Sequence, residues 1–561
     1  MKRKTTTIFK FLATLFTLVV FTSCDKKARE LTNLQIKSLD SIATIDVPND
    51  APGVATGIVM NGKIVYEKYA GYADLKDSTF IDGRSRFNIA SNGKQFTALA
   101  ILSLMDEGKL SLDDDIRTFF PKLYPTIKSK ITIAHLLNHT SGIRDVYNLL
   151  ALQGITWWEH TYDNNDALNL LRKQHDLNFE PGSKYYYSNS NYIVLAEIVS
   201  RASGSNFIDY TNQMFQDLNM PNTSFTGNYK TIDGPIAKPY FSFDTWFNYD
   251  WIWNIHGDGN IFSTLNDQLE FERILQTKKN KRFSKELLEQ SQSLLPNSST
   301  QKYGYGVEFM EHQKIPYKYH GGSTGAWKAI TARFEKQKFS IITLTNSGKT
   351  DPMTQTLNTA NVLMGLKSGS NDIRLTPEKI GPYVAIEDIV GMYEINGSIW
   401  EFVERDGDLY LLRAGRNDTK LVREADNVFQ QWNDAPFKQE FTKNKQGEML
   451  VTAYYTKTPV FTLTRKNTDF SGFDYEAVNG TYINNETSVS FKVEHTSGRK
   501  YKVVSGENVM NAFLLSKKEL VINDYNYRIK IGETKEGKTT NLFLTFRRIQ
   551  NVRFSRININ E

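Results

Sequence analysis

The stretch Ile89-Ala-Ser91-Asn-Gly-Lys94 leads directly into Gln95-Phe-Thr-Ala-Leu-Ala-Ile-Leu-Ser-Leu-Met-Asp-Glu107. Apolar residues cover nearly every face of this second segment and Gly108 is a good residue to end it, so we expect a buried helix. Ser91 and Lys94 are three residues apart and lie on one face. A lysine drawn into the interior can lose its proton and then accept that of a serine hydroxyl. The alternative is a helix-capping serine beside a solvated lysine.

Three further segments carry polar residues in patterns that suit such chemistry. In Tyr187-Ser-Asn189, the phenol can relay a proton and the amide can hold a substrate carbonyl or the lysine. In Tyr319-His320-Gly321-Gly322-Ser323-Thr-Gly325, glycines beside a strand edge allow a substrate backbone to approach closely. The fourth segment is Leu136-Leu-Asn-His139-Thr-Ser-Gly142. Taken alone, each of these has an ordinary structural interpretation.

Together and in this order, the four segments resemble the serine β-lactamase and penicillin-binding superfamily, in its class C-related branch of esterases and D-aminopeptidases. The resemblance covers residues of about 48 to 366. It implies that Ser91 is the acylated nucleophile and that Lys94 and Tyr187 share general base and acid work. Asn189 then orients the substrate, and the backbone N–H groups of Ser91 and Ser323 form the oxyanion hole. His320 and Gly322 belong to the substrate-binding motif, with His320 where other branches carry a lysine.

One residue departs from the family pattern. Gly93 stands where a serine or threonine usually precedes the lysine. The chemistry stays possible, and the floor of the pocket beside the nucleophile then lacks a side chain.

The order of predicted elements indicates an α/β (α+β) sandwich of the β-lactamase/transpeptidase-like type. Two apolar runs flank Asn61-Gly62, which is the strongest short signal for a hairpin. The sequence then favours helices and loops to about residue 285, and it favours strands again at 304–310, 326–335 and 339–346. A single sheet therefore joins both ends of the domain. We expect a signal peptide over 1–23, a tether over 24–47, this domain over 48–366 and a linker over 367–384.

Two small all-β barrels or sandwiches are expected beyond the linker, over 385–468 and 469–561. Gly391-Met-Tyr393 opens the first unit and Gly480-Thr-Tyr482 opens the second. Phe461-Thr-Leu-Thr-Arg465 is expected to close the first unit, and Phe543-Leu-Thr-Phe-Arg547 the second. Short alternating runs separated by turns fill both units. Neither contains an evident catalytic cluster.

The N-terminus has the features of a secretory leader with a lipid attachment site. A basic start is followed by an apolar run from Phe11 to Phe21, which is too short to span a bilayer. Thr22, Ser23 and Cys24 then resemble a bacterial lipobox, which implies cleavage before Cys24 and acylation of its thiol. We therefore expect a lipoprotein anchored in the cell envelope, facing the periplasm or the surface.

Composition narrows the choice of function. The 561 residues are 40% hydrophobic and 23% charged, as in ordinary globular proteins. Cys24 is the only cysteine, which excludes a disulfide framework and any cluster of cysteine ligands. Part of the net charge of +6 belongs to the leader, and nothing indicates a nucleic-acid partner. We expect no cofactor and no metal, because His135 and His139 lack the pattern of a metal site.

Two rival interpretations stand beside the family resemblance. Gly321-Gly-Ser323-Thr-Gly325 also satisfies the nucleophile elbow of α/β-hydrolases, but the elbow needs a helix after it and the sequence that follows alternates like a strand. The second rival is a degenerate binder of peptide or glycan.

The aromatic segment 240–256 is expected to form either a substrate wall or lid, or packing between domains.

The function that the sequence favours is a serine hydrolase that forms an acyl-enzyme and cleaves small esters or peptide and amide bonds, including bonds of D-amino acids. A β-lactamase or a D-Ala-D-Ala carboxypeptidase is the alternative enzyme. His320 gives no full charge at neutral pH, so we expect weak anchoring of a C-terminal carboxylate and poor turnover of penicillins.

Overall fold

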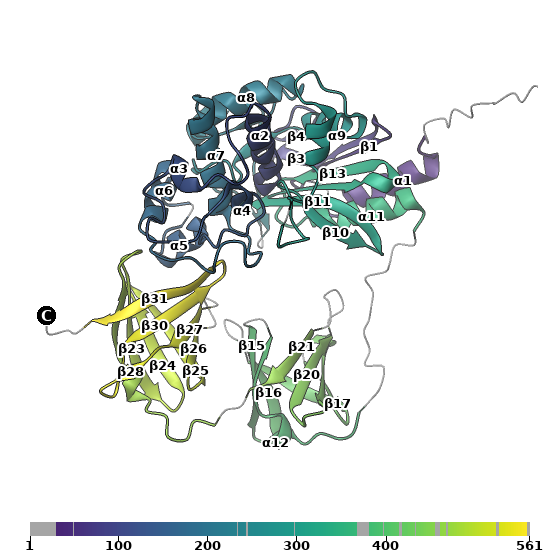
Figure 1. Cartoon of the computed structure of the whole chain (residues 1–561). Coiled ribbons are helices and arrows are strands. Elements are labelled where there is room, and N and C mark those ends of the chain that lie inside the picture. The colour runs from purple at the N-terminus through teal and green to yellow at the C-terminus, as the bar shows by residue number, and fades with distance from the viewer. Residues whose placement is uncertain are drawn as a thin grey trace, which may run out of the picture.

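The computed structural model has an α/β domain and two β-barrels, arranged as Figure 1 shows. It describes residues 30–366 and 381–557, except for short gaps at 49, 157, 233, 243–244, 297, 396–397, 414–417, 432–433, 455–460, 467–468 and 523–526. The predicted leader with Cys24 and most of the predicted linker lie outside the described residues.

One antiparallel sheet of six strands joins the two ends of the α/β domain, in the order β10-β11-β12-β13-β1-β2. The hairpin of β1 and β2 turns at Asn61 and Gly62, both with positive φ, as the Asn-Gly signal predicts. β1 then pairs with β13, from Val54 opposite Thr345 to Met60 opposite Phe339. The prediction that a single sheet joins both ends of the domain is confirmed. Its strands are β1 (Val54–Met60), β2 (Lys63–Ala70), β10 (Glu308–His312), β11 (Ile315–Thr324), β12 (Trp327–Phe334) and β13 (Phe339–Thr345).

Helices cover both faces of this sheet because strand side chains alternate between the faces. On one face Ile58 and Ile341 pack with Leu39 of α1 (Asn33–Thr44) and Leu363 of α11 (Pro352–Met364). On the other face Val59 and its neighbours face the large core of the helical region. Helix α1 lies within the predicted tether, so the packed domain begins before residue 48.

The helical region lies between β2 and β10 and is built around α2 (Lys94–Asp106). Every residue of α2 from Lys94 to Leu104 is buried, as the pattern of its sequence predicts. Gly108 follows with a φ of 69°, the left-handed conformation that ends helices. The other helices here are α3 (Ile116–Phe119), α4 (Ile133–Leu137), α5 (Val146–Leu152), α6 (Asn164–Arg172), α7 (Asn189–Ser203), α8 (Phe207–Asp217), α9 (Leu265–Thr277) and α10 (Lys285–Gln290).

Two glycines set the distance between the nucleophile's turn and its neighbours. A Cβ on Gly322 of β11 would lie 1.9 Å from the carbonyl oxygen of Ile89, so only glycine lets this strand meet the short helix Ala90–Gly93. A Cβ on Gly93 would lie 2.5 Å from a methyl of Ile261 in β9 (Ile261–Ser263). The departure at Gly93 is therefore matched by Ile261, which fills the space that a side chain would take.

The two β domains are closed barrels with the same architecture. The first contains β14 to β21 (391–465), and the second contains β22 to β27 with β30 and β31 (480–557). The Tyr393 hydroxyl donates to the carbonyl of Ile389 at 2.8 Å, and that of Tyr482 donates to the carbonyl of Val478 at the same distance. The predicted duplication is thus visible in packing as well as in sequence.

The strand that closes the second barrel differs from the sequence prediction. β30 (Asn541–Phe546), which contains most of the predicted closing strand, pairs with β27 (Tyr527–Ile531) and β31 (Ile549–Ile557). β31 closes the barrel on β22 (Gly480–Asn484). β30 and β21 (Phe461–Arg465) have a similar alternation of apolar residues, and for this reason both were predicted to close their barrels. Arg547, predicted to end a strand, instead lies in the turn between β30 and β31.

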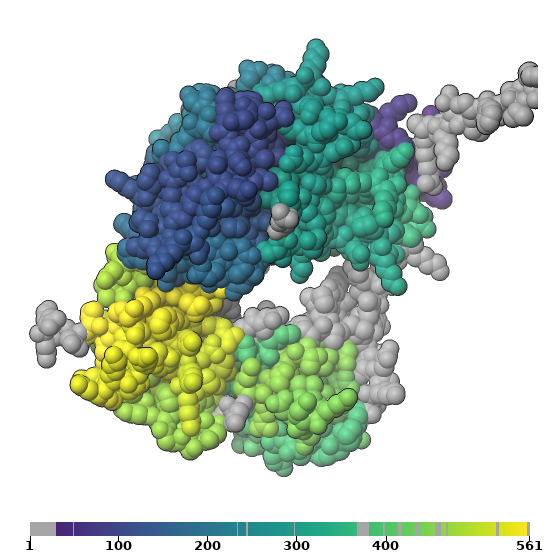
Figure 2. Space-filling view, viewed as in Figure 1, coloured from purple at the N-terminus to yellow at the C-terminus, as the bar shows by residue number. Residues whose placement is uncertain are grey.

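The second barrel packs against the helical region of the α/β domain. Figure 2 shows this barrel, in yellow, directly against the blue helical half of the molecule. Buried Arg144 donates to the backbone carbonyl of Gln550 at 3.3 Å and pairs with Glu486 at 3.5 Å. Asn178 accepts from the Gln550 N–H at 2.7 Å. Backbone and charged groups from both sides therefore fix the barrel's turns at the helical surface.

We expect Gly322→Ala to lower the thermal unfolding midpoint of the α/β domain and to slow labelling of Ser91. The added methyl would overlap the Ile89 carbonyl, and overpacking of this kind costs about 1–3 kcal/mol. Differential scanning calorimetry measures the first effect. Gly321→Ala is the matched control, because the nearest atom to its Cβ would be the end of the Ile330 side chain, at 3.2 Å. Equal midpoints for the two variants would contradict the close approach.

Candidate active site

Lys94 is the centre of the polar site at the start of α2. Its Nζ lies 2.9 Å from the Ser91 Oγ, and it donates to the Asn189 Oδ1 at 3.0 Å and to the backbone carbonyl of Asp258 at 2.5 Å. The side chain is fully buried. Burial lowers the pKa of Lys94 to about 7, against the opposing carboxylate of Asp258. A substantial fraction of Lys94 is therefore a neutral amine at neutral pH, and a neutral amine can accept the Ser91 proton.

Tyr187 lies on the other side of the same pair. Its ring centre is 5.0 Å from Lys94 Nζ and 4.2 Å from the centre of the His139 ring. Burial raises the pKa of Tyr187 well above its ordinary value, although a hydrogen bond with Ser91 opposes this. The phenol is therefore protonated at neutral pH. The two residues that the sequence left sharing acid and base work are thus distinguished: Lys94 can accept a proton, and Tyr187 can donate one.

Asn189 begins α7 and is held by a carboxylate that the sequence analysis did not identify. Its backbone N–H and its side-chain amide donate to Asp145 Oδ2 at 2.8 and 3.0 Å. Asp145 also accepts from the N–H groups at the start of α5. These contacts leave the Asn189 carbonyl oxygen aimed at Lys94. The signal for Asp145 was its place three residues after the Thr-Ser-Gly segment, just before an apolar run.

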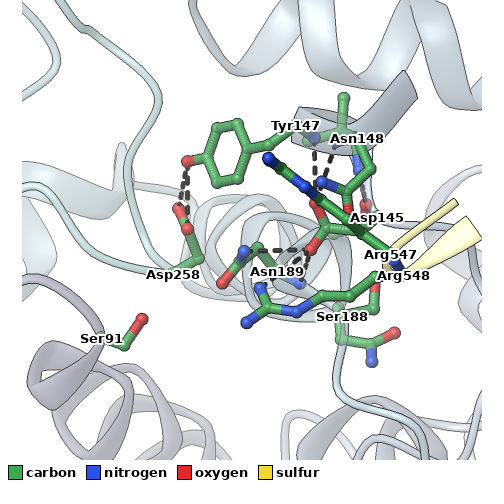
Figure 3. A network of polar contacts seen from close by, with 12 residues as sticks. Ser91, Asp145, Tyr147, Asn148, Ser188, Asn189, Asp258, Arg547 and Arg548 are labelled. Carbon is green, nitrogen blue, oxygen red and sulfur yellow. Dashed lines mark hydrogen bonds and ion pairs between the residues drawn. The ribbon is translucent and has the colours of Figure 1, made fainter. Parts of the chain in front are cut away.

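Asp258 is the second residue that sequence reasoning missed. Its backbone carbonyl accepts from Lys94, and its carboxylate accepts from the Tyr147 hydroxyl at 3.0 Å (Figure 3). Burial raises the pKa of Asp258 to about 6. A lone aspartate in a glycine-rich loop offers no sequence signal for this role.

His320 lies on β11 with both ring nitrogens in use. Nδ1 donates to the backbone carbonyl of Gly321 at 2.7 Å, so Nε2 accepts from the Tyr303 hydroxyl at 2.8 Å. Burial lowers the pKa of His320 to about 3, which keeps the ring neutral. The sequence analysis placed His320 in the substrate-binding motif, but the structure directs the ring proton to the Gly321 carbonyl.

Ser323, at the end of β11, lines the same pocket as Ser91. β10 ends beside β11 at the pairing of Glu308 with Tyr319, so beyond Tyr319 this edge of β11 has no strand beside it. Ser91 and Ser323 both line a pocket of about 540 Å³. Strand β12 follows Ser323 after a short turn, and no helix does. The α/β-hydrolase elbow is therefore excluded, because it requires a helix there.

The histidines His135 and His139 do not form a metal site. The His135 Nδ1 accepts from the N–H of Thr132 at the start of α4, and the His139 Nδ1 accepts from the Ser188 N–H. His139 packs among aromatic rings, and burial lowers its pKa well below the ordinary value. In the part of the chain that the structure describes, no three histidine, cysteine or carboxylate side chains gather as metal ligands.

The aromatic segment of 240–256 contributes to a pocket wall at one end. Trp251 and Trp253 line the pocket, together with Trp158 from another loop. Tyr240, by contrast, is buried and donates to Asp74 at 3.0 Å. Asp74 belongs to the same α/β domain, so this end of the segment packs within the domain, and the predicted packing between domains is not what Tyr240 does.

Two arginines of the second barrel complete the polar surroundings. Arg547 lines the pocket, and the guanidinium of Arg548 lies 4.6 Å from the Tyr187 ring centre and 3.6 Å from Asp145 (Figure 3). The sequence analysis saw no catalytic cluster in this barrel. The two residues are adjacent in a hairpin turn, and nothing in their sequence shows which distant surface that turn meets.

A serine beside a buried, deprotonatable lysine and a protonated tyrosine is an arrangement that can form and resolve an ester on the serine. Over residues 42–364 the chain matches the family described as Beta-lactamase, and it belongs to that family. The predicted superfamily is thereby confirmed.

Known proteins resemble this chain over the α/β domain and beyond. Protein flp of Staphylococcus aureus is 29% identical over 342 residues, which cover 56% of this chain and 64% of flp. The D-aminopeptidase of Brucella anthropi is 24% identical over 414 residues, 67% of this chain and 76% of that enzyme. The octameric penicillin-binding protein homologue of Pyrococcus abyssi superimposes with a TM-score of 0.55 at 21% identity, over 77% of this chain and all of that one. The chain thus spans slightly less than two thirds of the length of flp.

We expect the second-order rate constant for acylation of Ser91 to rise with pH through an apparent pKa of about 7. Below that pH Lys94 is an ammonium and cannot accept the serine proton; above it the amine is free. Rates of p-nitrophenol release from p-nitrophenyl acetate, extrapolated to kcat/KM between pH 5 and 9, measure this. Lys94→Arg removes the inflection if Lys94 causes it. A profile that stays flat from pH 6 to 8 would contradict the assignment.

Proposed function

We propose that the protein is a serine hydrolase that cleaves small esters or amides, including amides of D-amino acids, through an acyl-enzyme on Ser91. The observation that carries the proposal is the 2.9 Å separation of the Lys94 Nζ and the Ser91 Oγ inside the protein. The D-aminopeptidase of Brucella anthropi, a relative over two thirds of this chain, supports the amide and D-residue part of the proposal.

The reaction follows from the geometry of the site. Ser91 Oγ attacks the substrate carbonyl carbon while its proton passes to the neutral amine of Lys94. The oxyanion that forms accepts hydrogen bonds from the backbone N–H groups of Ser91 and Ser323. Tyr187 gives its proton to the leaving amine or alcohol as the carbon–heteroatom bond breaks, and the Lys94 ammonium returns a proton to the phenolate. Water then hydrolyses the ester on Ser91 by the reverse proton path.

The environment of His320 argues against a β-lactamase or D-Ala-D-Ala carboxypeptidase. Such substrates present a carboxylate near the third motif, and here that motif offers a buried, neutral ring whose proton is already donated. The degenerate binder is the remaining alternative. The intact contacts of Ser91, Lys94 and Tyr187 favour an enzyme, since a binder needs no lowered lysine pKa.

A fluorophosphonate should label Ser91, and Ser91→Ala should abolish both labelling and turnover. Intact-mass measurement followed by peptide mapping locates the adduct. Ser323→Ala is the matched control, because Ser323 lines the same pocket and contributes only its backbone to the proposed mechanism. An adduct on Ser323, or turnover that survives Ser91→Ala, would place the nucleophile elsewhere.

A small substrate panel then separates the candidate activities. It contains nitrocefin, p-nitrophenyl acetate and butyrate, and the p-nitroanilides of D- and L-alanine. We expect ester or D-anilide cleavage and poor nitrocefin turnover. Fast nitrocefin hydrolysis with negligible release from the others would restore the β-lactamase.

We also propose that the protein is held in the cell envelope by a lipid on Cys24. The support is the lipobox-like sequence that ends at Cys24. Among the described residues, the structure contains no helix that is long and apolar enough to cross a bilayer.

Cys24→Ser should abolish lipid incorporation and move the protein from the membrane fraction to the soluble fraction, because the thiol is the acylation site. Fractionation after a salt wash, with metabolic labelling by a fatty acid, measures both changes. Ser23→Ala keeps the thiol and should remain lipidated. Membrane attachment of Cys24→Ser after the wash would mean that another anchor exists.

A further inference from the structure

The turn between β30 and β31 carries the second barrel's contribution to the active-site pocket. Arg547 occupies the turn with a φ of 47° and lines the pocket that also contains Ser91. Figure 3 shows both arginines of the turn reaching from the barrel strands toward Asn189 and Tyr147. The pocket is therefore shared between two domains that are far apart in the sequence.

Hydrogen bonds to the backbone hold this turn in place. The Tyr186 hydroxyl donates to the Arg547 carbonyl at 2.6 Å. The Arg548 N–H donates to the Asn148 Oδ1 at 3.0 Å, and the Asn178 side-chain amide donates to the Arg548 carbonyl at 3.0 Å. The anchors are independent of the arginine side chains, so changing a guanidinium should not undock the turn.

The two arginines differ in how their charge is balanced. Arg548 pairs with Asp145 and stacks on Tyr187. The Arg547 guanidinium lies near the ring of Phe546, at 5.0 Å from its centre, and no carboxylate among the described residues pairs with it. Asp258 is the acidic residue that lines the pocket, and it already accepts from Tyr147 and lies against Lys94. The pocket lining therefore holds one cation, Arg547, which no described carboxylate pairs, and one carboxylate, Asp258, which the Tyr147 hydroxyl already engages.

The pocket lies on the acyl side of the scissile bond. A leaving group must face the proton donor, and Tyr187 does not line this pocket, nor do Lys94 or His320. Ser91, Ser323 and Asn189 do line it, together with an apolar wall. The substrate portion retained on Ser91 therefore extends into the pocket and toward Arg547. The apolar wall consists of Leu150, Ala151, Ile155, Trp158, Trp251 and Trp253.

We propose that Arg547 is an anion-binding subsite that selects substrates with a carboxylate on the acyl side, separated from the scissile carbonyl by an apolar segment. This inference rests on the proposed function. The guanidinium fork matches a carboxylate in two hydrogen bonds, and the apolar wall fits the segment between the two groups. The same charge repels a free α-ammonium, so a substrate with an N-terminal amine is disfavoured unless an acidic group caps it.

Three substrates with a cationic, a neutral and an anionic acyl side test the subsite: the p-nitroanilides of D-alanine, N-acetyl-D-alanine and N-succinyl-D-alanine. A second pair, the p-nitrophenyl esters of monoglutarate and pentanoate, makes the same comparison with a better leaving group. We expect kcat/KM to be about tenfold higher for each anionic substrate than for its neutral match, the lower end of what a charge-assisted hydrogen bond supplies. Arg547→Gln should erase that ratio, and Arg547→Lys should retain part of it. The neutral substrates should change little in either variant.

Controls separate this subsite from the catalytic machinery. If the wild-type protein releases product from none of these compounds, both the proposed function and this subsite are contradicted. Release without a charge preference, or a preference that Arg547→Gln leaves intact, contradicts the subsite alone. Preference for the free amine would assign the pocket's recognition to Asp258. In 3-carboxyphenyl acetate and phenyl acetate the charge difference lies on the leaving group. If Arg547→Gln changes the ratio of kcat/KM for these two esters and leaves the succinyl series unchanged, the acyl-side placement is overturned.

Discussion

The structure of the site depends on the burial of one lysine amine. A neutral amine has two N–H donors and one lone pair. At Lys94 two acceptors are provided, the Asn189 side-chain carbonyl and the Asp258 backbone carbonyl, and the remaining direction meets the Ser91 hydroxyl. The neutral form is thereby fully satisfied with its lone pair toward the nucleophile. An ammonium in the same place gains no carboxylate as a direct partner, so burial costs it more than its hydrogen bonds return.

Residues from several elements hold Lys94 and its partners in this arrangement. α2 is apolar on all sides, and this draws the first residue of the helix into the interior. Asp145 fixes Asn189 through two hydrogen bonds. Gly322 and Gly93 let β11 and Ile261 approach the nucleophile's turn from opposite sides. Arg548 adds a cation near Lys94 that also acts to lower its pKa, so a barrel more than 380 residues along the chain influences the proposed base.

Much of the fold follows from local sequence, and the reasons are local too. The apolar continuity of α2, the Asn61-Gly62 turn and the repeated Gly-x-Tyr of the barrels each predict an element from neighbouring residues. Ser91 and Lys94 are predictable because one helical turn places them together. Tyr187 and Asn189 required the family resemblance, since no spacing joins them to Ser91.

The remaining residues depend on which loops meet in three dimensions. Asp258 acts through its backbone carbonyl, a group that every residue has, so its identity carries no signal. Arg547 and Arg548 act only because their turn is anchored at Asn148, Asn178 and Tyr186. The missing full charge of His320 is predictable from its ordinary pKa, but the acceptor of its ring proton is not, and only the structure places the Gly321 carbonyl at 2.7 Å.

The most direct test of this account is the titration of Lys94 itself. Protein labelled with ¹³C at the lysine Cε carbons gives a signal whose shift reports the charge of each amine, and Lys94→Arg identifies the signal of Lys94. The account predicts a midpoint of about 7 for this signal, while exposed lysines titrate near 10.4. A Lys94 midpoint at or above 10 would mean that the buried amine stays charged at neutral pH, and it would contradict the central claim.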